Sequence, residues 1–282
     1  MYDFFRASDR DSDLACERRR ADTSLSGVSY RKEFTAGGVW ERIRITDSEG
    51  EESIGRPRGS YDTLTVERMD LLDAEELEDA SEEIARELCR LVEGAAASPD
   101  RILIVGLGNR ELTPDSVGPR SVELVNATMQ VKEYDPLTFA SLNCSEIAVL
   151  SPGVSSESGL DAAALVRSVC DMILPDAVIA VDSLAARSSA RLGRTVQLSD
   201  TGIFPGSGIG NPRGEITKKT VGLPVIAIGV PTVIDARLLV GESSEMLSGE
   251  AMFVSPKEIN GIVKSAARII SGGINQAFGI EI

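Results

Sequence analysis

From residue 101 onward, short apolar runs alternate with longer amphipathic stretches, and this alternation limits the possible folds more than any other feature of the sequence. The first run, 101–106, is almost continuously hydrophobic, as expected of a strand buried on both faces. Further strands are expected at 147–150, 177–181, 195–198 and 225–230, with helices at 117–130, 160–174, 183–191, 232–240 and 256–278. The pattern predicts an α/β fold, a mostly parallel sheet flanked by helices, with its core at about 100–282.

The N-terminal third has a different pattern of residues. Residues 1–30 are charged and rich in serine, so we expect a mobile arm. Residues 30–66 place brief apolar groups between Gly, Ser and Pro, which is typical of short strands or hairpins. Leucine and isoleucine then recur at helical spacing over 74–93, which predicts an amphipathic helix with an acidic outer face. We therefore divide the chain into an arm, 1–30, and a single α/β domain, 31–282.

The sequence contains no histidine, which removes Ser-His-Asp and Cys-His catalysis and the usual zinc sites. A catalyst built from this chain must use carboxylates, Lys, Ser, Thr, Tyr, Cys or backbone groups. The net charge of −15 argues against binding to nucleic acid or to an anionic membrane, because both require a basic face. Most of the acidic surplus lies before residue 101, away from the predicted sheet core.

The cysteines and the N-terminus indicate a cytoplasmic protein. Cys16, Cys89, Cys144 and Cys170 lie far apart without CxxC spacing, so we expect reduced thiols. We expect Cys144 and Cys170 to be structural, since no histidine can activate them as nucleophiles. The N-terminus has no apolar segment of signal-peptide length, and no run approaches the roughly 18 apolar residues of a membrane span.

The first predicted strand leads into a long loop that contains Asp115. Gly106 and Gly108 match the start of a dinucleotide-binding fingerprint, but Glu111 replaces its third glycine and would face the pyrophosphate. Asp115 precedes a predicted helix start at Ser116, where a helix-capping carboxylate is the structural alternative to a catalytic one.

A second acid, Asp182, directly follows the apolar run at 177–181. Sites in open α/β sheets form beyond the carboxyl ends of the strands, so Asp182 is either a catalytic carboxylate or an ordinary cap. Arg187, about one helical turn further on, is its expected ion partner.

Asp115 and Asp182 matter most as a pair. Two neighbouring carboxylates do not both ionise readily, so one keeps a proton near neutral pH and the other does not. Such a pair can activate a water molecule and protonate a leaving amine without any histidine. Whether the two acids meet depends on the order of the strands, which the sequence does not give.

A glycine-rich segment, 199–211, follows another predicted strand and includes Gly206 and Gly208. We expect these glycines and Arg187 to bind an extended substrate; a long structural turn is the alternative. Asp200 is a third candidate acid, and Asp235 is a fourth whose role we expect to be structural.

Several segments resemble, in order and approximate spacing, the germination proteases of endospore-forming bacteria, which degrade small acid-soluble spore proteins. These segments are ILIVGLGN…LTPDSVGP, LSPGV, AVIAVDSLAARS, QLSDTGIFPGSGIGN and LPVIAIGVPTVIDA, spread over roughly residues 100–237. A weaker similarity at 10–17, RDSDLACE, resembles the propeptide junction of the family.

The resemblance implies a phosphorylase/hydrolase-like fold related to hydrogenase-maturation proteases, and a homotetramer. It implies an atypical aspartic-type endopeptidase whose two essential aspartates match Asp115 and Asp182. It also implies a zymogen that cleaves itself between Asp13 and Leu14, which would make 1–13 a propeptide. The implied substrates are small acid-soluble spore proteins in the forespore or spore core, and no cofactor is expected.

Two alternatives stay open. In the first, Asp115, Asp182 and a third acid hold a divalent cation through oxygen ligands and catalyse metal-assisted hydrolysis of the hydrogenase-maturation type. In the second, the chain is a non-enzymatic module that binds a peptide or a nucleotide on an α/β scaffold.

Overall fold

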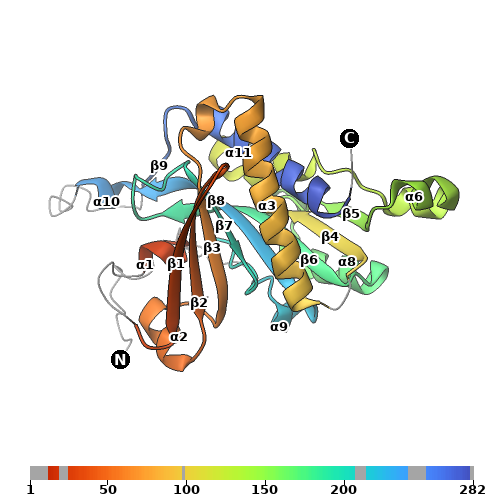
Figure 1. Ribbon diagram of the computed structural model, residues 1–282, viewed down its shortest axis with the longest axis horizontal. Coiled ribbons are helices and arrows are strands. Elements are labelled where there is room, and N and C mark those ends of the chain that lie inside the picture. The colour runs from red at the N-terminus through yellow and green to blue at the C-terminus, as the bar shows by residue number, and fades with distance from the viewer. Residues whose placement is uncertain (1–11, 19–24, 97–98, 207–213, 241–251, 280–282) are drawn as a thin grey trace.

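In the computed structural model, which describes residues 12–18, 25–96, 99–206, 214–240 and 252–279, strands from both ends of the chain meet in one sheet (Figure 1). The order of its strands is β1-β2-β3-β7-β8-β6-β4-β5, and β9 pairs with β8. The strands are β1 (Val28–Thr35), β2 (Gly38–Ile45), β3 (Gly59–Thr65), β4 (Arg101–Gly106), β5 (Glu146–Leu150), β6 (Ala177–Ala186), β7 (Thr195–Ser199), β8 (Val225–Asp235) and β9 (Phe253–Val254).

The sheet is mixed, and its parallel part comes from residue 101 onward. Strands β5, β4, β6 and β8 run parallel to one another. The N-terminal hairpin strands do not form a separate unit, because β3 pairs antiparallel with β7, and β7 pairs antiparallel with β8. The α/β fold with helices around a large sheet is confirmed, and the antiparallel N-terminal strands extend the same sheet.

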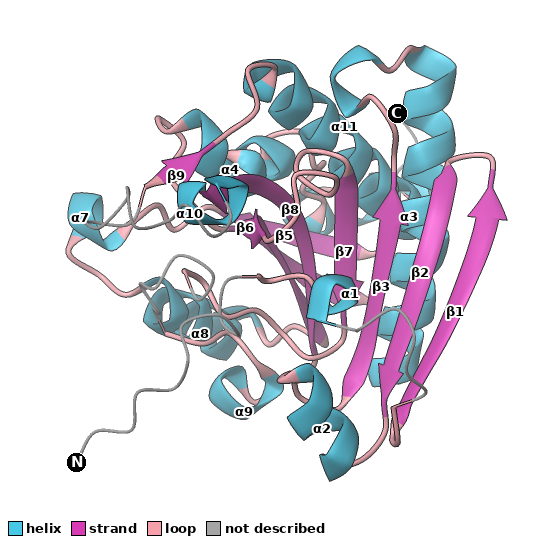
Figure 2. Ribbon diagram, turned by 90° about the vertical axis from the view of Figure 1, so that its left-hand side faces the viewer, coloured by secondary structure: helices cyan, strands magenta, loops and turns pink. Residues whose placement is uncertain are grey.

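Helices cover both faces of the sheet (Figures 1 and 2). One face packs against α3, α4 and α11, and the opposite face packs against α8 and α9. The helices are α1 (Ala15–Arg18), α2 (Ser48–Ile54), α3 (Ala74–Ala95), α4 (Val117–Val122), α5 (Met129–Tyr134), α6 (Pro136–Leu142), α7 (Ser155–Ser158), α8 (Ala162–Ile173), α9 (Lys218–Val221), α10 (Ala236–Val240) and α11 (Ile259–Ala277), with 3-10 helices η2 (Met69–Leu71) and η3 (Thr113–Asp115). Among the helices of the described ranges, none has the length and apolar character needed to cross a bilayer.

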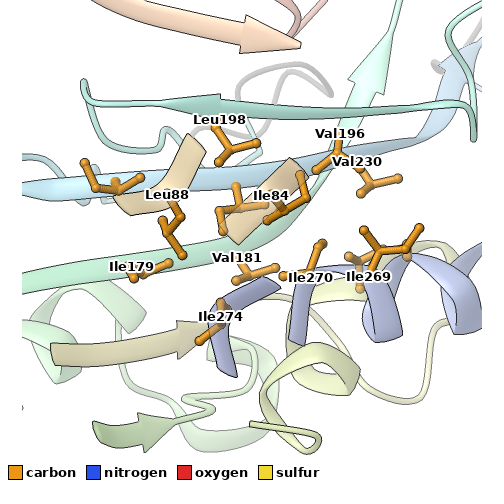
Figure 3. Packing of buried hydrophobic residues seen from close by; sticks show 14 of the residues in the cluster. Ile84, Leu88, Ile179, Val181, Val196, Leu198, Val230, Ile269, Ile270 and Ile274 are labelled. Carbon is orange, nitrogen blue, oxygen red and sulfur yellow. The ribbon is translucent and has the colours of Figure 1, made fainter. Parts of the chain in front are cut away.

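The larger core lies between the sheet and the helix pair α3 and α11 (Figure 3). Helix α3 begins with a capping box, in which Asp73 and Glu76 each accept a hydrogen bond from the other's backbone N–H. Its residue Ile84 is fully buried and approaches Gly273 of α11 so closely that a Cβ there would lie 2.6 Å from the isoleucine. Each such buried aliphatic side chain contributes about 1.5–3 kcal/mol to stability.

One predicted helix is absent and another is shortened, because strands continue through their expected starts. The helix predicted at 183–191 does not form, since β6 runs on through Ala186 and pairs along this stretch with β8. The helix predicted at 232–240 begins only at Ala236, because β8 extends to Asp235. Pairing with a neighbouring strand supplies backbone hydrogen bonds that override the local helical preference of an alanine-rich segment. The helix predicted at 117–130 is also shorter, and α4 ends at Val122.

A buried group of charges joins the N-terminal hairpin to α3. Asp62 of β3 is fully buried, and Glu87 of α3 is 2% exposed. Arg90 donates to Asp62 at 2.6 Å, and both Arg42 and Arg90 bind Glu87. Burial and the neighbouring Glu87 carboxylate raise the pKa of Asp62 to about 7, while hydrogen bonds from Arg90 and Arg42 offset the effect of burial and lower the pKa of Glu87. Asp62 therefore takes up a proton within the physiological pH range.

The raised pKa of Asp62 makes a prediction about stability. The protonated carboxyl stabilises the folded state fully below about pH 4, and this contribution is lost as the pH rises through about 7. The free energy of unfolding of Asp62→Asn, relative to the natural protein, should therefore rise by about 1 kcal/mol or more between pH 5 and pH 8. Urea unfolding at both pH values measures it.

Asp70→Asn is the control for this measurement. Asp70 is bound by Arg68, which lowers its pKa. The difference in free energy of unfolding between this variant and the natural protein should therefore stay the same between pH 5 and pH 8. Parallel stability curves for Asp62→Asn and the natural protein would contradict the prediction.

Candidate active site

A cavity of about 310 Å³ opens at the carboxyl ends of β4 and β6, and both predicted acids line it. Asp115 reaches it from the loop after β4, and Asp182 reaches it from within β6. Its other walls include the α7–α8 region, the segment around Gly206, and strand β8. The structure thus brings Asp115 and Asp182 to one chamber at the edge of the sheet where α/β proteins place their sites.

Asp182 is held by an extended strand and not by a helix. It is 5% exposed, and its Oδ1 accepts a hydrogen bond from the Ser183 N–H at 2.8 Å. Asp182 pairs with Gly229 of the neighbouring strand β8. Gly229 leaves room for the Leu184 side chain, since a Cβ at Gly229 would lie 2.5 Å from that side chain. The hydroxyl of Ser183, which also lines the cavity, has no hydrogen-bond partner within the described chain.

Asp115 is held by the loop on which it lies. Its Oδ2 accepts a hydrogen bond from the Asn109 N–H at 2.9 Å. Gly108 has a φ of +113°, and a Cβ there would lie 2.1 Å from the Asp115 carbonyl oxygen. This close approach of the backbone to itself requires glycine and sets where the Asp115 carboxylate lies.

Contacts from the neighbouring strands fix the same loop. The Thr232 hydroxyl of β8 donates to the Pro114 carbonyl at 2.6 Å, and the Leu107 N–H donates to the Val181 carbonyl at 2.8 Å. A Cβ at Gly118 would lie 2.4 Å from that same Val181 carbonyl, so α4 packs directly on the strand that carries Asp182. The two acids are therefore positioned by one rigid assembly of strands.

The three residues predicted to bind substrate differ in where they lie relative to the cavity and to the described part of the chain. Gly206 lines the cavity, with a φ of +73°. Gly208 lies outside the described residues. Arg187 is exposed and lies beyond the end of β6, so the one-turn helical spacing that would pair it with Asp182 does not exist. Its backbone N–H instead donates to Glu17 at 2.7 Å.

The short N-terminal segment 12–17 lies beside the cavity, and Asp13 is part of the cavity wall. Asp13 pairs with Ala185 of β6 twice: its N–H donates to the Ala185 carbonyl, and its carboxylate accepts from the Ala185 N–H, each at 2.9 Å. Leu14 and Ala15, which follow it, are fully buried. Composition indicated a mobile arm here, and it could not reveal these hydrogen bonds because the partners lie about 170 residues away.

Three further groups hold this segment. Arg56 donates to the Ser12 carbonyl at 3.1 Å and to the Asp13 carboxylate at 3.4 Å. The Gln197 side chain binds the backbone on both sides of Leu14. The Glu17 carboxylate accepts from the backbone N–H groups of residues 187 and 188. Helix α1 then lies over β2 and β3 (Figure 2).

The other acids considered from the sequence are bound to structural partners. Asp200 accepts hydrogen bonds from the backbone and the hydroxyl of Ser60, each at 2.7 Å, and so ties the end of β7 to β3. Asp235 forms an ion pair with Arg237, which lowers its pKa. Asp161 lines the cavity but caps α8 by accepting from the Ala164 N–H at 3.0 Å.

Chemistry at a thiol or at a metal ion was also considered from the sequence. Burial raises the pKa of Cys16 and of Cys170 to about 11, which keeps both thiols protonated at neutral pH. In the part of the chain that the structure describes, no three Cys, Asp or Glu side chains are grouped so that they could hold a metal ion.

Sequence reasoning missed Arg56 and Gln197. A signal for Gln197 existed, because it is a polar residue inside the apolar run at 195–198. A buried amide is costly unless it is hydrogen-bonded, so its presence there indicates a specific partner. Arg56 carried no such signal, since it lies in a charged turn between Gly55 and Pro57.

Comparisons with known proteins identify the family of the chain. Residues 7–248 match the family model described as germination protease. The germination protease of Caldanaerobacter subterraneus subsp. tengcongensis is 38% identical, over 94% of this chain and 93% of its own length. That of Clostridium acetobutylicum is 33% identical over 94% of each chain. That of Bacillus subtilis is 36% identical, over 84% of this chain and 66% of its own.

One solved structure is a more distant match. The [NiFe] hydrogenase maturation protease HycI from Thermococcus kodakarensis has 18% identity and a TM-score of 0.36, over 67% of this chain and 99% of its own, which is too little to bear on the site.

The family match and these relatives together define the class of the protein: it is a protease, and therefore a hydrolase, on an α/β scaffold. The chain belongs to the germination protease family. The expected family and the expected enzymatic class are both confirmed.

Proposed function

We propose that this protein is an endopeptidase that begins the degradation of small acid-soluble spore proteins during germination, and that it is made as a zymogen which cleaves itself between Asp13 and Leu14. The observation that carries the proposal is that Asp13 lines the same cavity as Asp115 and Asp182. The residue before the proposed cleavage site thus lies at the wall of the chamber that both candidate catalytic acids also line.

The chemistry is hydrolysis by a carboxylate pair. An ionised aspartate accepts a proton from water while the water oxygen forms a bond to the carbonyl carbon of Asp13, and the carbonyl oxygen takes up the electron pair. The carbon–nitrogen bond then breaks, and the protonated partner aspartate gives its proton to the nitrogen of Leu14. One water is consumed, and the two acids exchange protonation states. The proposed reaction requires no resident metal.

The contacts of the docked segment also describe the substrate. The carboxylate before the cleaved bond lies against Arg56, with the two side chains 13% and 12% exposed. The residue after the bond, Leu14, is fully buried. An extended chain with an acidic residue before the cleaved bond and an apolar residue after it therefore fits the site, and such segments are readily accessible in an unfolded spore protein.

Assembly and location form part of the same proposal. The family resemblance implies a homotetramer within the spore core. Tyr134 of α5 and Leu137 of α6 are 79% and 85% exposed, which is the kind of apolar surface that a subunit contact would cover.

The direct test is to incubate the full chain, first alone and then with a purified small acid-soluble spore protein. Mass spectrometry should find a new N-terminus at Leu14 and fragments of the spore protein. Both reactions should continue after exhaustive chelation with EDTA. Intact spore protein after prolonged incubation with the processed enzyme would refute the substrate, and loss of activity on chelation would favour metal-assisted hydrolysis.

Arg56 gives a sharper prediction for self-cleavage. Arg56→Ala removes the ion pair and the hydrogen bond to the Ser12 carbonyl, so the segment is held less firmly and the rate of self-cleavage should fall about 10-fold, as expected for one charge-assisted contact of about 1.4 kcal/mol. Arg58→Ala is the matched control, because Arg58 pairs with Glu51 at the surface. Equal rates for the two variants, measured as the appearance of the Leu14 N-terminus, would show that the Arg56 contact does not guide cleavage.

A further inference from the structure

We propose that Gln197 is a third catalytic residue, whose side-chain amide stabilises the negative charge that develops on the carbonyl oxygen of the cleaved bond. This inference rests on the proposed cleavage between Asp13 and Leu14. The Gln197 Nε2 donates to the Asp13 carbonyl oxygen at 3.2 Å, and that oxygen belongs to the bond in question.

The orientation of the amide follows from its two partners. Gln197 Oε1 accepts a hydrogen bond from the Ala15 N–H at 2.8 Å. A backbone N–H can only donate, so the oxygen of the amide must face Ala15, and its NH₂ group must face the Asp13 carbonyl. The amide therefore spans Leu14 and holds the peptide on both sides of the residue that follows the cleaved bond.

A role within the sheet does not account for this side chain. Gln197 is 8% exposed and lies in β7 between Thr63 of β3 and Gly229 of β8. Within the described chain, both hydrogen bonds of its side chain go to the segment 13–15, and none goes to the strands around it. Burying an amide costs free energy unless its hydrogen bonds are made, so the residue is built to meet a peptide in this place.

Asp13 lines two cavities, one shared with the two acids and one shared with the amide. Asp13 lines the large cavity together with Asp115 and Asp182. It also lines a second cavity of about 30 Å³, whose wall includes Gln197 and Arg56. Water activated in the large cavity would attack the carbonyl carbon, while the carbonyl oxygen keeps its hydrogen bond from the amide.

The hydrogen bond matters more in the transition state than in the ground state. As the water oxygen bonds to the carbon, the carbonyl oxygen gains charge and the bond from Nε2 becomes charge-assisted and shorter. Removing one donor to such an oxyanion typically lowers kcat by about 10²–10³-fold. The hydrogen bond to Ala15 contributes to binding in both states and should affect KM instead.

The test compares Gln197→Glu with Gln197→Ala, assayed from pH 5 to pH 9 as processed enzymes with a peptide that spans residues 8–20. Both variants should lose about 10²-fold or more in kcat at pH 8. The glutamate keeps the acceptor for Ala15 but donates only when it is protonated, so the ratio of Glu to Ala activity should rise about 10-fold or more as the pH falls. Ser199→Ala is the matched control, since Ser199 lines the same small cavity from the same strand.

The outcomes separate this inference from the proposed function. A kcat for Gln197→Ala within about 3-fold of the natural enzyme, or a glutamate variant no more active than the alanine variant at every pH, would overturn the role of Gln197 while the protease stands. If the alanine variant fails to fold, Gln197→Met takes its place, and the activity of Gln197→Glu is compared with that of Gln197→Met at each pH. Absence of peptide cleavage by the natural enzyme would instead refute the proposed function itself.

Discussion

Replacing either Asp115 or Asp182 with asparagine should lower cleavage of a spore-protein peptide by at least about 10³-fold, with the fold retained. Asparagine has nearly the shape of aspartate, and the backbone donors that now bind the two carboxylates can still bind the amide oxygen. What is lost is the exchange of a proton with water and with the leaving amine, and removal of such a group commonly costs 10³-fold or more. Measurement of kcat, together with a thermal unfolding curve for each variant, tests it.

Two controls make this test specific. Asp161→Asn changes a carboxylate that lines the same cavity but caps α8, so it should cost at most about 1 kcal/mol of stability and leave kcat unchanged. Ser183→Ala removes the hydroxyl that has no hydrogen-bond partner in the described chain, and it should also leave kcat unchanged if water is the nucleophile. Loss of activity only in Ser183→Ala, with both asparagine variants active, would point to a serine nucleophile.

Gly108→Ala should lower kcat by about 10²-fold, although Gly108 carries no reacting group. An alanine Cβ would lie 2.1 Å from the Asp115 carbonyl oxygen and 3.1 Å from its carboxylate, and the φ of +113° is itself unfavourable for alanine. The loop must open to relieve this contact, which displaces Asp115, and a misplacement of about 1 Å can cost 10²-fold in rate. Steady-state kinetics and the melting temperature measure the two effects separately.

Gly159→Ala is the matched control for this variant. Gly159 also has a positive φ, +72°, but a Cβ there meets nothing within 4 Å. It should therefore show only the backbone cost of about 1–2 kcal/mol, with kcat unchanged. Equal kinetics for Gly108→Ala and the natural enzyme would show that the position of Asp115 does not depend on the glycine.

The elements predicted best from the sequence were those whose burial pattern is local. The apolar run at 101–106 became β4 with the same bounds, and the helix predicted at 256–278 became Ile259–Ala277. The predictions that were wrong concern segments where a strand passes beyond its apolar run, as β6 does from Asp182 to Ala186. Whether such a segment remains extended depends on a partner strand elsewhere in the chain, and β8 supplies that partner over the same stretch.

The residues of the candidate site also fall into those that the sequence identified and those that it did not. Asp115 and Asp182 were selected from the sequence because each follows a buried strand, and because a chain without histidine has few other catalysts to offer. Arg56 and Gln197 could not be assigned, since their roles arise from contacts with residues 12–15, and those contacts cross 43 or more positions of sequence. The expected ion pair between Arg187 and Asp182 was wrong because it assumed a helix where the chain forms a strand.

The sequence by itself determined the alternation of strands and helices, the restriction to chemistry without histidine, and the two acids. These depend on residue types and on short-range periodicity. Only the tertiary structure decided that the two acids share one cavity, that the N-terminal hairpin joins the same sheet, and that the segment around Asp13 lies at the cavity wall. The physical reason is that each of these depends on strand order and on hydrogen bonds between distant segments, which the packing of the whole sheet selects and no local pattern encodes.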